Sequence, residues 1–153
     1  MPLSEFENLK SLRPLIGKEI AVSDWFTVTQ ERINQFAEAT GDHQWIHVDV
    51  ERAKRESPYK TTIAHGFLTL SLLAGIAIDT IKIKSVKMGV NYGLNRVRFT
   101  DAVPAGSKIR AHFVLQSMED LPLENGSQAV WHVTVERDGS SKPGLLGEWR
   151  GRR

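Results

Sequence analysis

The residues best suited to chemistry are Asp42 and His47, which lie five positions apart after the helix-ending glycine Gly41. A carboxylate beside an imidazole can hold a water molecule and move its proton, which is general acid–base catalysis. Histidine suits this work because its unperturbed pKa is about 6.5. The pair is therefore a candidate water-activating site. The same spacing would also occur in a purely structural arrangement, in which the aspartate caps a turn and the histidine bonds to a backbone carbonyl.

A second candidate feature begins at the pair His65-Gly66, which precedes an apolar run that extends to Ile78. The backbone N–H groups in the first turn of a helix have no acceptor within the helix, and they carry partial positive charge. Such groups can stabilise an oxygen that becomes negative, and Gly66 lets another group approach closely. Water activation together with an oxyanion site indicates chemistry on a carbonyl compound.

The run over residues 66–78 also predicts the central structural element. Its apolar residues fall on nearly every side of a helical wheel, so we expect a helix that other structure encloses. Its thirteen residues would rise about 20 Å, whereas a membrane-spanning helix needs roughly 20 residues. Residues 42–49 are predicted to form a loop. Further helices are predicted over residues 4–12, 29–40 and 50–55.

After residue 79 the apolar residues recur with a period of two, which is typical of strands. In residues 128–135, Ala129, Trp131, Val133 and Val135 share one face, which we expect to pack on the central helix. Turn signals at residues 104–106, 124–126 and 138–139 separate the strands at hairpin spacing. Helices followed by strands predict an α+β fold whose antiparallel sheet covers the apolar helix. The predicted strands are residues 20–28, 82–90, 96–99, 108–115, 128–135 and 145–150.

The composition narrows the possible functions. The chain has 153 residues, of which 41% are hydrophobic and 25% charged, so we expect one soluble domain over residues 1–153. The absence of cysteine excludes disulfides and thiolate chemistry, and it is compatible with the cytoplasm, where we expect the protein. A net charge of +2 without a long basic run argues against a nucleic-acid partner. Neither a signal peptide nor a membrane association is expected.

Three stretches resemble a known family. The stretches FAEATGDHQWIHVD (residues 36–49) and IAHGFL (residues 63–68) resemble MaoC-like dehydratases and (R)-specific enoyl-CoA hydratases, and are most similar to the nodulation-protein-N-like branch. The stretch NYGLNRVRF (residues 91–99) also resembles that branch. The resemblance implies a hot-dog fold, in which a curved antiparallel β-sheet wraps a long central helix. It also implies a homodimer.

The resemblance implies roles for individual residues. In this family an aspartate and a histidine activate the water that adds across the double bond of an acyl-CoA thioester, and the matching positions are Asp42 and His47. The N–H of Gly66 is implied to hold the thioester oxygen as enolate charge develops. The implied activity is the hydration of trans-2-enoyl-CoA to (R)-3-hydroxyacyl-CoA by a lyase. Neither an organic cofactor nor a metal is expected, because the thioester itself supports the charge.

The sequence departs from the usual motif, Gly-Asp-x-Asn-Pro-hydrophobic-His, at two positions. Gln44 and Trp45 stand where the motif has Asn and Pro. Gln44 can make the same kinds of hydrogen bond as Asn with a longer reach, and Trp45 could line or narrow the acyl pocket. We therefore expect both residues to contact the substrate, together with His65 and Asn91. The length of the acyl chain stays open.

Two alternatives to the hydratase remain at this stage. One is an acyl-CoA thioesterase on the same fold, and the other is a non-catalytic acyl-CoA-binding protein. A metal site at His43 or His65 is not expected, because the sequence lacks a pattern such as His-Glu-x-x-His. His112 and His132 fall on strand faces and are expected to be ordinary surface residues.

Overall fold

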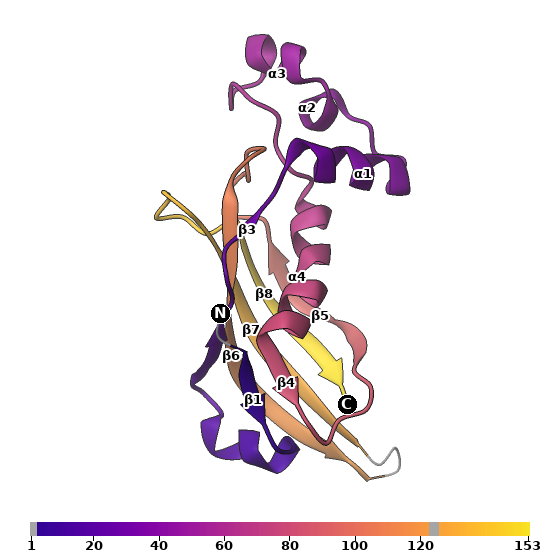
Figure 1. Ribbon diagram of the computed structural model, residues 1–153, viewed down its shortest axis with the longest axis vertical. Helices are drawn as coiled ribbons and strands as arrows, with labels where there is room; N and C mark the ends of the chain where they lie inside the picture. Colours follow the sequence, from indigo (N-terminus) through magenta and orange to yellow (C-terminus); the bar gives the residue numbers. More distant parts are fainter. Residues whose placement is uncertain (1–2, 123–125) are drawn as a thin grey trace.

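The computed structural model describes residues 3–122 and 126–153, and it confirms the α+β architecture. The long helix α4 lies across one face of an antiparallel sheet, and α1, α2 and α3 lie together beyond its N-terminal end (Figure 1). In chain order the elements are β1 (Ser4–Phe6), the 3-10 helix η1 (Leu9–Leu15), β2 (Glu19–Val22), β3 (Phe26–Thr27), α1 (Gln30–Thr40), α2 (Trp45–Val48), α3 (Val50–Glu56), α4 (Gly66–Thr80), β4 (Ile81–Ile83), β5 (Val90–Arg98), β6 (Lys108–Leu121), β7 (Gly126–Arg137) and β8 (Leu145–Arg152).

The main sheet has the strand order β2-β6-β7-β8-β5, with β3 also paired to β6. The hairpin of β6 and β7 is its longest pairing and runs from Ile109 opposite Arg137 to Leu121 opposite Gly126. Strand β5 pairs with β8, so β5 lies at one edge of the sheet. A second, two-stranded sheet pairs β1 with β4 in parallel. The chain therefore fastens its N-terminal strand to the strand that follows α4.

The core lies between α4 and the facing side of the sheet. Leu68, Leu73 and Ile76 of α4 are buried in one apolar cluster with alternate residues of β6 and β7. This arrangement confirms the predicted inward face of residues 128–135, because burial removes apolar surface from water and favours a strand with one apolar side. The inward strand residues are Ile109, Ala111, Phe113, Leu115, Ala129, Trp131, Val133 and Val135.

Several local predictions were wrong. The helix predicted over residues 4–12 begins later, as η1 over Leu9–Leu15 with Asn8 rather than Ser4 as its cap, because residues 4–6 form β1 and pair with β4. The predicted strand over 82–90 divides into β4 and β5, and the one over 20–28 divides into β2 and β3. The segment 42–49, predicted to be a loop, contains the one-turn helix α2. The turn predicted at 124–126 includes residues 124 and 125, which lie outside the described residues.

The expectation that other structure encloses α4 is also wrong for a single chain. The sheet covers only one side of the helix, so Phe67 is 67% exposed and Ile78 is 74% exposed. Both residues lie on the opposite side of the helix from the buried Leu68, Leu73 and Ile76. The sequence of α4 is thus apolar on two sides, while the fold of one chain buries only one of them.

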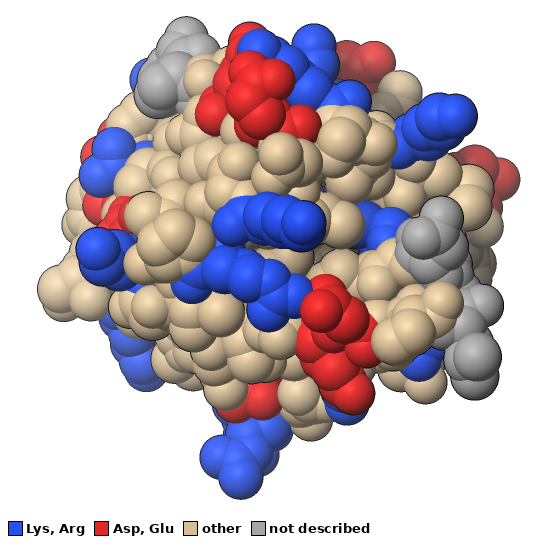
Figure 2. All heavy atoms as spheres, turned by 90° about the horizontal axis from the view of Figure 1, so that it is seen from below, with Lys and Arg blue, Asp and Glu red and all other residues tan. Residues whose placement is uncertain are grey.

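Charged side chains of both signs are mixed on the face of the molecule that lies opposite α1, α2 and α3 (Figure 2). Figure 2 shows lysines and arginines beside acidic residues at the end remote from α1, α2 and α3. Among the ion pairs, Lys84 lies 2.7 Å from Glu7, and Arg13 lies 2.5 Å from Asp120. Mixed charge of this kind differs from the basic stripe of a nucleic-acid-binding protein. No helix among the described residues is long and apolar enough to cross a membrane.

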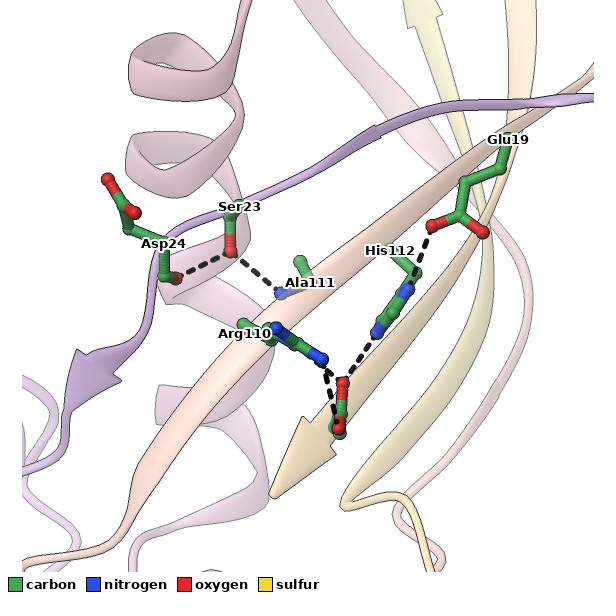
Figure 3. Close-up of polar contacts among 7 residues, drawn as sticks. Glu19, Ser23, Asp24, Arg110, Ala111 and His112 are labelled. Atoms are coloured by element: carbon green, nitrogen blue, oxygen red, sulfur yellow. Dashed lines mark hydrogen bonds and ion pairs between the residues drawn. The ribbon is translucent and has the colours of Figure 1, made fainter. Parts of the chain in front are cut away.

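A charged cluster on the sheet ties β2 to β6 and β7 (Figure 3). The imidazole of His112 lies between two carboxylates, with Nδ1 2.9 Å from Glu19 and Nε2 2.7 Å from Glu136. Arg110 donates to Glu136 through two nitrogens, at 2.7 and 3.3 Å. His112 was predicted to be an ordinary surface residue. This prediction is wrong, because its two partners come from strands far away in the sequence. His132, by contrast, is exposed on the surface, as predicted.

The cluster shifts two pKa values. Burial lowers the pKa of His112, but the hydrogen bonds to Glu136 and Glu19 outweigh it, so the pKa lies above the ordinary 6.5. Hydrogen bonds from Arg110 and then from His112 hold the pKa of Glu136 below its ordinary 4.5. The contribution of His112 to stability is therefore full below pH 6.5 and is lost as the pH rises through its folded pKa. That of Glu136 is present above pH 4.5 and is lost as the pH falls through its folded pKa.

We therefore predict that His112→Gln lowers the free energy of unfolding more at about pH 5.5 than at about pH 8.5. The difference should be about 0.5–1 kcal/mol, because the partners are partly exposed to solvent. Urea unfolding at the two pH values measures it. His132→Gln is the matched control and should show the same small effect at both. An equal loss for His112→Gln at both pH values would contradict the charged bridge.

Candidate active site

The first part of the site is the turn that follows α1. Thr29 caps the start of α1 by accepting a hydrogen bond from the N–H of Arg32, and Gly41 ends the helix in the left-handed conformation, at φ 82°. The next residue is Asp42, whose carboxylate accepts a hydrogen bond from the N–H of Gln44 at 3.2 Å. Gln44 in turn precedes the first residue of α2. The Asp42 carboxylate is thus held at the entrance to the helix that carries His47.

The imidazole of His47 is buried and its tautomer is set by one hydrogen bond. Its Nδ1 lies 2.7 Å from the backbone oxygen of Ile63. A carbonyl can only accept, so Nδ1 carries the proton and Nε2 keeps its lone pair. Burial lowers the pKa of His47; the Ile63 hydrogen bond opposes this, the nearby His65 adds to it, and Asp42 opposes it. The neutral ring can therefore accept a proton at Nε2 near neutral pH.

His65 lies against His47 and also contacts the Asp42 segment. The two rings are stacked, with centroids 3.9 Å apart and planes inclined by 23°. The Nε2 of His65 lies 3.0 Å from the backbone oxygen of Asp42, and its buried Nδ1 has no hydrogen-bond partner among the residues that the structure describes. One ligand atom of each residue, Asp42, His47 and His65, lies within 4.8 Å of the others. The structure thus brings the predicted pair together and adds His65 to it.

The stacking of the two histidines bears on whether these three residues could hold a metal ion. A histidine binds a metal through a nitrogen lone pair that lies in the plane of its ring, at about 2.0–2.1 Å. Because the planes of His47 and His65 are only 23° from parallel, their lone pairs do not converge on one ion. One nitrogen of each ring also faces a backbone carbonyl. The arrangement suits the binding of water and the movement of its proton better than the coordination of a metal.

Gly66, the first residue of α4, lines the same cavity as His47. Its N–H belongs to the first helical turn, where backbone donors have no acceptor within the helix. The cavity has a volume of about 390 Å³. Its other wall comes from the segment after β5. The lining residues are His47, Tyr59, Ile63, Ala64, Gly66, Thr69, Phe99, Thr100, Asp101, Ala102, Val103, Lys142 and Gly144.

The ring of Phe99 explains why position 66 is a glycine. A Cβ added at Gly66 would lie 2.9 Å from the Phe99 ring, closer than side chains pack. Phe99 also makes an edge-on contact with Phe67, with ring centroids 5.9 Å apart. The absence of a side chain at Gly66 therefore lets an aromatic ring lie directly against the start of α4, beside the cavity.

The other predicted substrate-binding residues lie outside this group. Gln44 contributes its backbone N–H, and its side chain does not cap α2. Trp45 stacks under the guanidinium group of Arg52, 4.3 Å from the ring centroid. Asn91 accepts a hydrogen bond from Trp149 at 2.8 Å and lines a separate cavity of about 240 Å³ near the C-terminal end of α4. In a single chain, Trp45 and Asn91 do not line the cavity that holds His47 and Gly66.

Several residues of the site were not predicted from the sequence. Thr69 is buried, lines the cavity and lies three positions after Gly66, a helical spacing that could have revealed it. Tyr59 and Phe99 line the cavity from distant segments, and neither was singled out, although Phe99 ends the motif stretch at residues 91–99. Gln30 donates a hydrogen bond to the backbone oxygen of His47, and Thr62 donates one to Gln30. Only the tertiary structure shows that these two residues belong to the site.

Comparison with known proteins identifies one family and several related proteins. The family described as "MaoC like domain" matches residues 11–136. The chain is 51% identical over 144 residues to 3-hydroxyacyl-thioester dehydratase Z of Mycobacterium tuberculosis (strain ATCC 25618 / H37Rv), covering 94% of this chain and 93% of the relative. It is 47% identical over 137 residues to nodulation protein N of Rhizobium leguminosarum bv. viciae, covering 88% of this chain and 83% of the relative.

A solved structure shows the same fold. The R-hydratase PhaJ1 from Pseudomonas aeruginosa, in the unliganded form, superimposes with a TM-score of 0.70 at 20% sequence identity. The superposition covers 95% of this chain and 84% of that chain. At this identity the likeness extends to the arrangement of helix and sheet, which is the hot-dog fold predicted from the sequence motifs.

The contact between Gly66 and Phe99 leads to a prediction about stability. Gly66→Ala should lower the free energy of unfolding by about 1–3 kcal/mol, because the new methyl group overlaps the ring. In a Phe99→Ala background the same substitution should cost much less, since the ring is gone. Denaturant unfolding of the two single variants and the double variant measures this coupling. If Gly66→Ala costs the same in both backgrounds, the ring does not restrict position 66.

Proposed function

Because the chain belongs to the MaoC-like dehydratase family, we propose that it is a hydro-lyase that acts on 3-hydroxyacyl thioesters. Specifically, we propose the reversible hydration of trans-2-enoyl-CoA to (R)-3-hydroxyacyl-CoA. The observation that carries the proposal is the position of His47. Its ring is buried beside the Asp42 carboxylate, and its Nε2 is unprotonated. His47 also lines a cavity that includes the start of α4. The relatives named above, a 3-hydroxyacyl-thioester dehydratase among them, support this activity.

In the hydration direction, Asp42 and His47 bind the same water molecule. As the water oxygen bonds to C3 of the enoyl group, the pair takes one proton from it, and the C2–C3 double bond becomes a thioester enolate. The Gly66 N–H donates to the enolate oxygen, which is the atom that gains negative charge. The pair then delivers that proton to C2, so that one water molecule is consumed and the pair returns to its starting state. Dehydration follows the same steps in reverse.

The carrier of the acyl group is the finer part of the proposal. The name of the M. tuberculosis relative specifies a thioester, which both coenzyme A and an acyl carrier protein can form. We propose coenzyme A, and parallel assays with both carriers decide between them. Release of free thiol, followed in the same samples, would reveal the thioesterase considered above.

We predict that Asp42→Asn and His47→Ala each reduce the turnover of enoyl-CoA by ~10²–10⁴-fold, the contribution typical of a general acid–base group. The double variant should be little worse than the poorer single variant, because groups that act on one water are not additive. His43→Ala is the matched control, since that exposed histidine is next to Asp42 and pairs with Glu38 at 3.7 Å. Turnover close to that of the wild type in a folded single variant would refute the assignment.

We also propose that the protein is a homodimer with twofold symmetry. The uncovered side of α4 and the edge strand β5 both expose large apolar residues, among them Phe67, Ile78, Val90, Tyr92 and Leu94. An edge strand also presents unpaired backbone N–H and C=O groups, which a second chain can satisfy. Side-by-side pairing of two copies would cover the strand edge and the apolar residues together. Such pairing is isologous, as in most homodimers.

Ile78→Glu should convert the dimer to a monomer, because it places a carboxylate on the apolar side of α4. Sedimentation at micromolar concentration measures the assembly state. Val50→Glu, on the exposed surface of α3, is the control and should leave the dimer intact. A wild-type protein that is monomeric at that concentration and still fully active would contradict the proposal.

A further inference from the structure

Two polar residues far apart in the sequence, Gln30 and Thr62, meet beside His47. Gln30 is the first residue of α1 and Thr62 lies just before α4. The side-chain amide of Gln30 donates through Nε2 to the backbone oxygen of His47 at 2.8 Å. Its Oε1 accepts a hydrogen bond from the hydroxyl of Thr62. The amide thus joins the helix that carries His47 to the segment that includes Ile63.

These contacts form a closed circuit of hydrogen bonds around the imidazole, which we call the ring around His47. From the His47 ring the path runs through Nδ1 to the oxygen of Ile63, along the backbone to Thr62, through its hydroxyl to Gln30, and back to the His47 carbonyl. A backbone hydrogen bond of 3.0 Å from Ile63 to Ile46 crosses the ring. The direction of the Gln30 amide is determined, because only its nitrogen can donate to a carbonyl and only its oxygen can accept from the hydroxyl.

The segment 62–64 is itself fixed from the opposite side. Ala64 donates to Val103 at 2.8 Å, and Ala105 donates to Thr62 at 2.9 Å. Thr62 is 1% exposed, so water does not replace its hydroxyl readily. The Ile63 carbonyl, which accepts the hydrogen bond from His47 Nδ1, is therefore attached to the cavity wall at residues 103–105. Gln30 holds α2 at a fixed position relative to this carbonyl.

We infer that Gln30 and Thr62 are positioning residues, which hold the His47 imidazole in one tautomer and one orientation for proton transfer. Neither side chain is placed among the reacting groups, so both act through the backbone around His47. Without the Thr62 hydroxyl, Gln30 loses the contact that orients its amide, and α2 can move relative to Ile63. The activity measurements that test this inference rest on the proposed function.

The sharpest test is the pair Thr62→Val and Thr62→Ser. Valine keeps the shape of the side chain and removes the hydroxyl, whereas serine keeps the hydroxyl. Thr62→Val should lower kcat about 10–10²-fold with little change in KM, the effect expected when a catalytic group is misplaced by a fraction of an ångström to an ångström. Thr62→Ser should restore most of the activity. A purely structural role would instead lower the melting temperature of Thr62→Val and leave kcat of the folded protein unchanged.

Gln30 offers a second pair of variants. Gln30→Glu has almost the same shape but replaces the donor to the His47 carbonyl with an acceptor, so kcat should fall by a similar factor. Gln30 also donates to Asn34, one turn later on α1, at 2.9 Å. Asn34→Ala removes that contact and leaves the ring around His47 intact, so its kcat should equal that of the wild type. Equal losses for Gln30→Glu and Asn34→Ala would overturn the inference.

A measurement independent of activity separates this inference from the proposed function. Nitrogen NMR of the imidazole should show His47 of the wild type as the single Nδ1–H tautomer, and His47 of Thr62→Val as a mixture of two tautomers. If the wild type hydrates no thioester but the spectra change in this way, the proposed function fails and the positioning role stands. If folded Thr62→Val keeps both a single tautomer and the wild-type kcat, the positioning role is wrong.

Discussion

The hydrogen bond from His47 Nδ1 to the Ile63 carbonyl joins the two parts of the chain that build the site. His47 belongs to the helical layer of α1, α2 and α3, whereas Ile63 belongs to the segment that leads into α4. The bond fixes which ring nitrogen can accept a proton, and it also sets the distance between α2 and the start of α4. The stacking of His65 on His47 and the cavity at Gly66 both require that distance.

The central helix has two apolar sides, and they serve different purposes. One side packs on the sheet and builds the core, while the other stays exposed in a single chain. Phe67 and Phe99 connect this exposed side with the site, because their rings touch each other and Phe99 also lies against Gly66. A partner that covers α4 and β5 would therefore come close to the cavity. In the proposed dimer, this aromatic pair would therefore lie between the partner chain and the candidate site.

Local signals were sufficient to predict α1, α4 and the inner face of β7, but they did not predict α2, the short helix that carries His47. The Thr29 cap and the Gly41 stop gave α1, the apolar run gave α4, and the alternation in 128–135 gave the inner face of β7. The motifs then indicated Asp42, His47 and Gly66 before any geometry was known. Each of these signals lies within one short stretch of sequence, which explains why sequence reasoning could find it.

Contacts between distant segments could not be found in this way. The parallel pairing of β1 with β4 overrode a helix-capping pattern at Ser4, because tertiary hydrogen bonds satisfied the backbone instead. His112 looked like a surface residue until the fold supplied Glu19 and Glu136 as partners. Gln30 and Thr62 are 32 positions apart and have ordinary local contexts. Such residues become functional only through the partners that folding brings to them.

The departure from the family motif can now be interpreted from the packing of Gln44 and Trp45. Gln44 still supplies the backbone N–H that holds the Asp42 carboxylate, a contact that does not depend on the side chain. The ring of Trp45 stacks on Arg52 of α3 and does not line the cavity beside His47 in this chain. At the two positions that depart from the motif, the Trp45 side chain therefore packs α2 on α3, and the Gln44 side chain takes no part in the contact that holds Asp42. In the proposed hydratase, the acyl chain would then contact other residues of the cavity wall, among them Tyr59, Thr69 and Phe99.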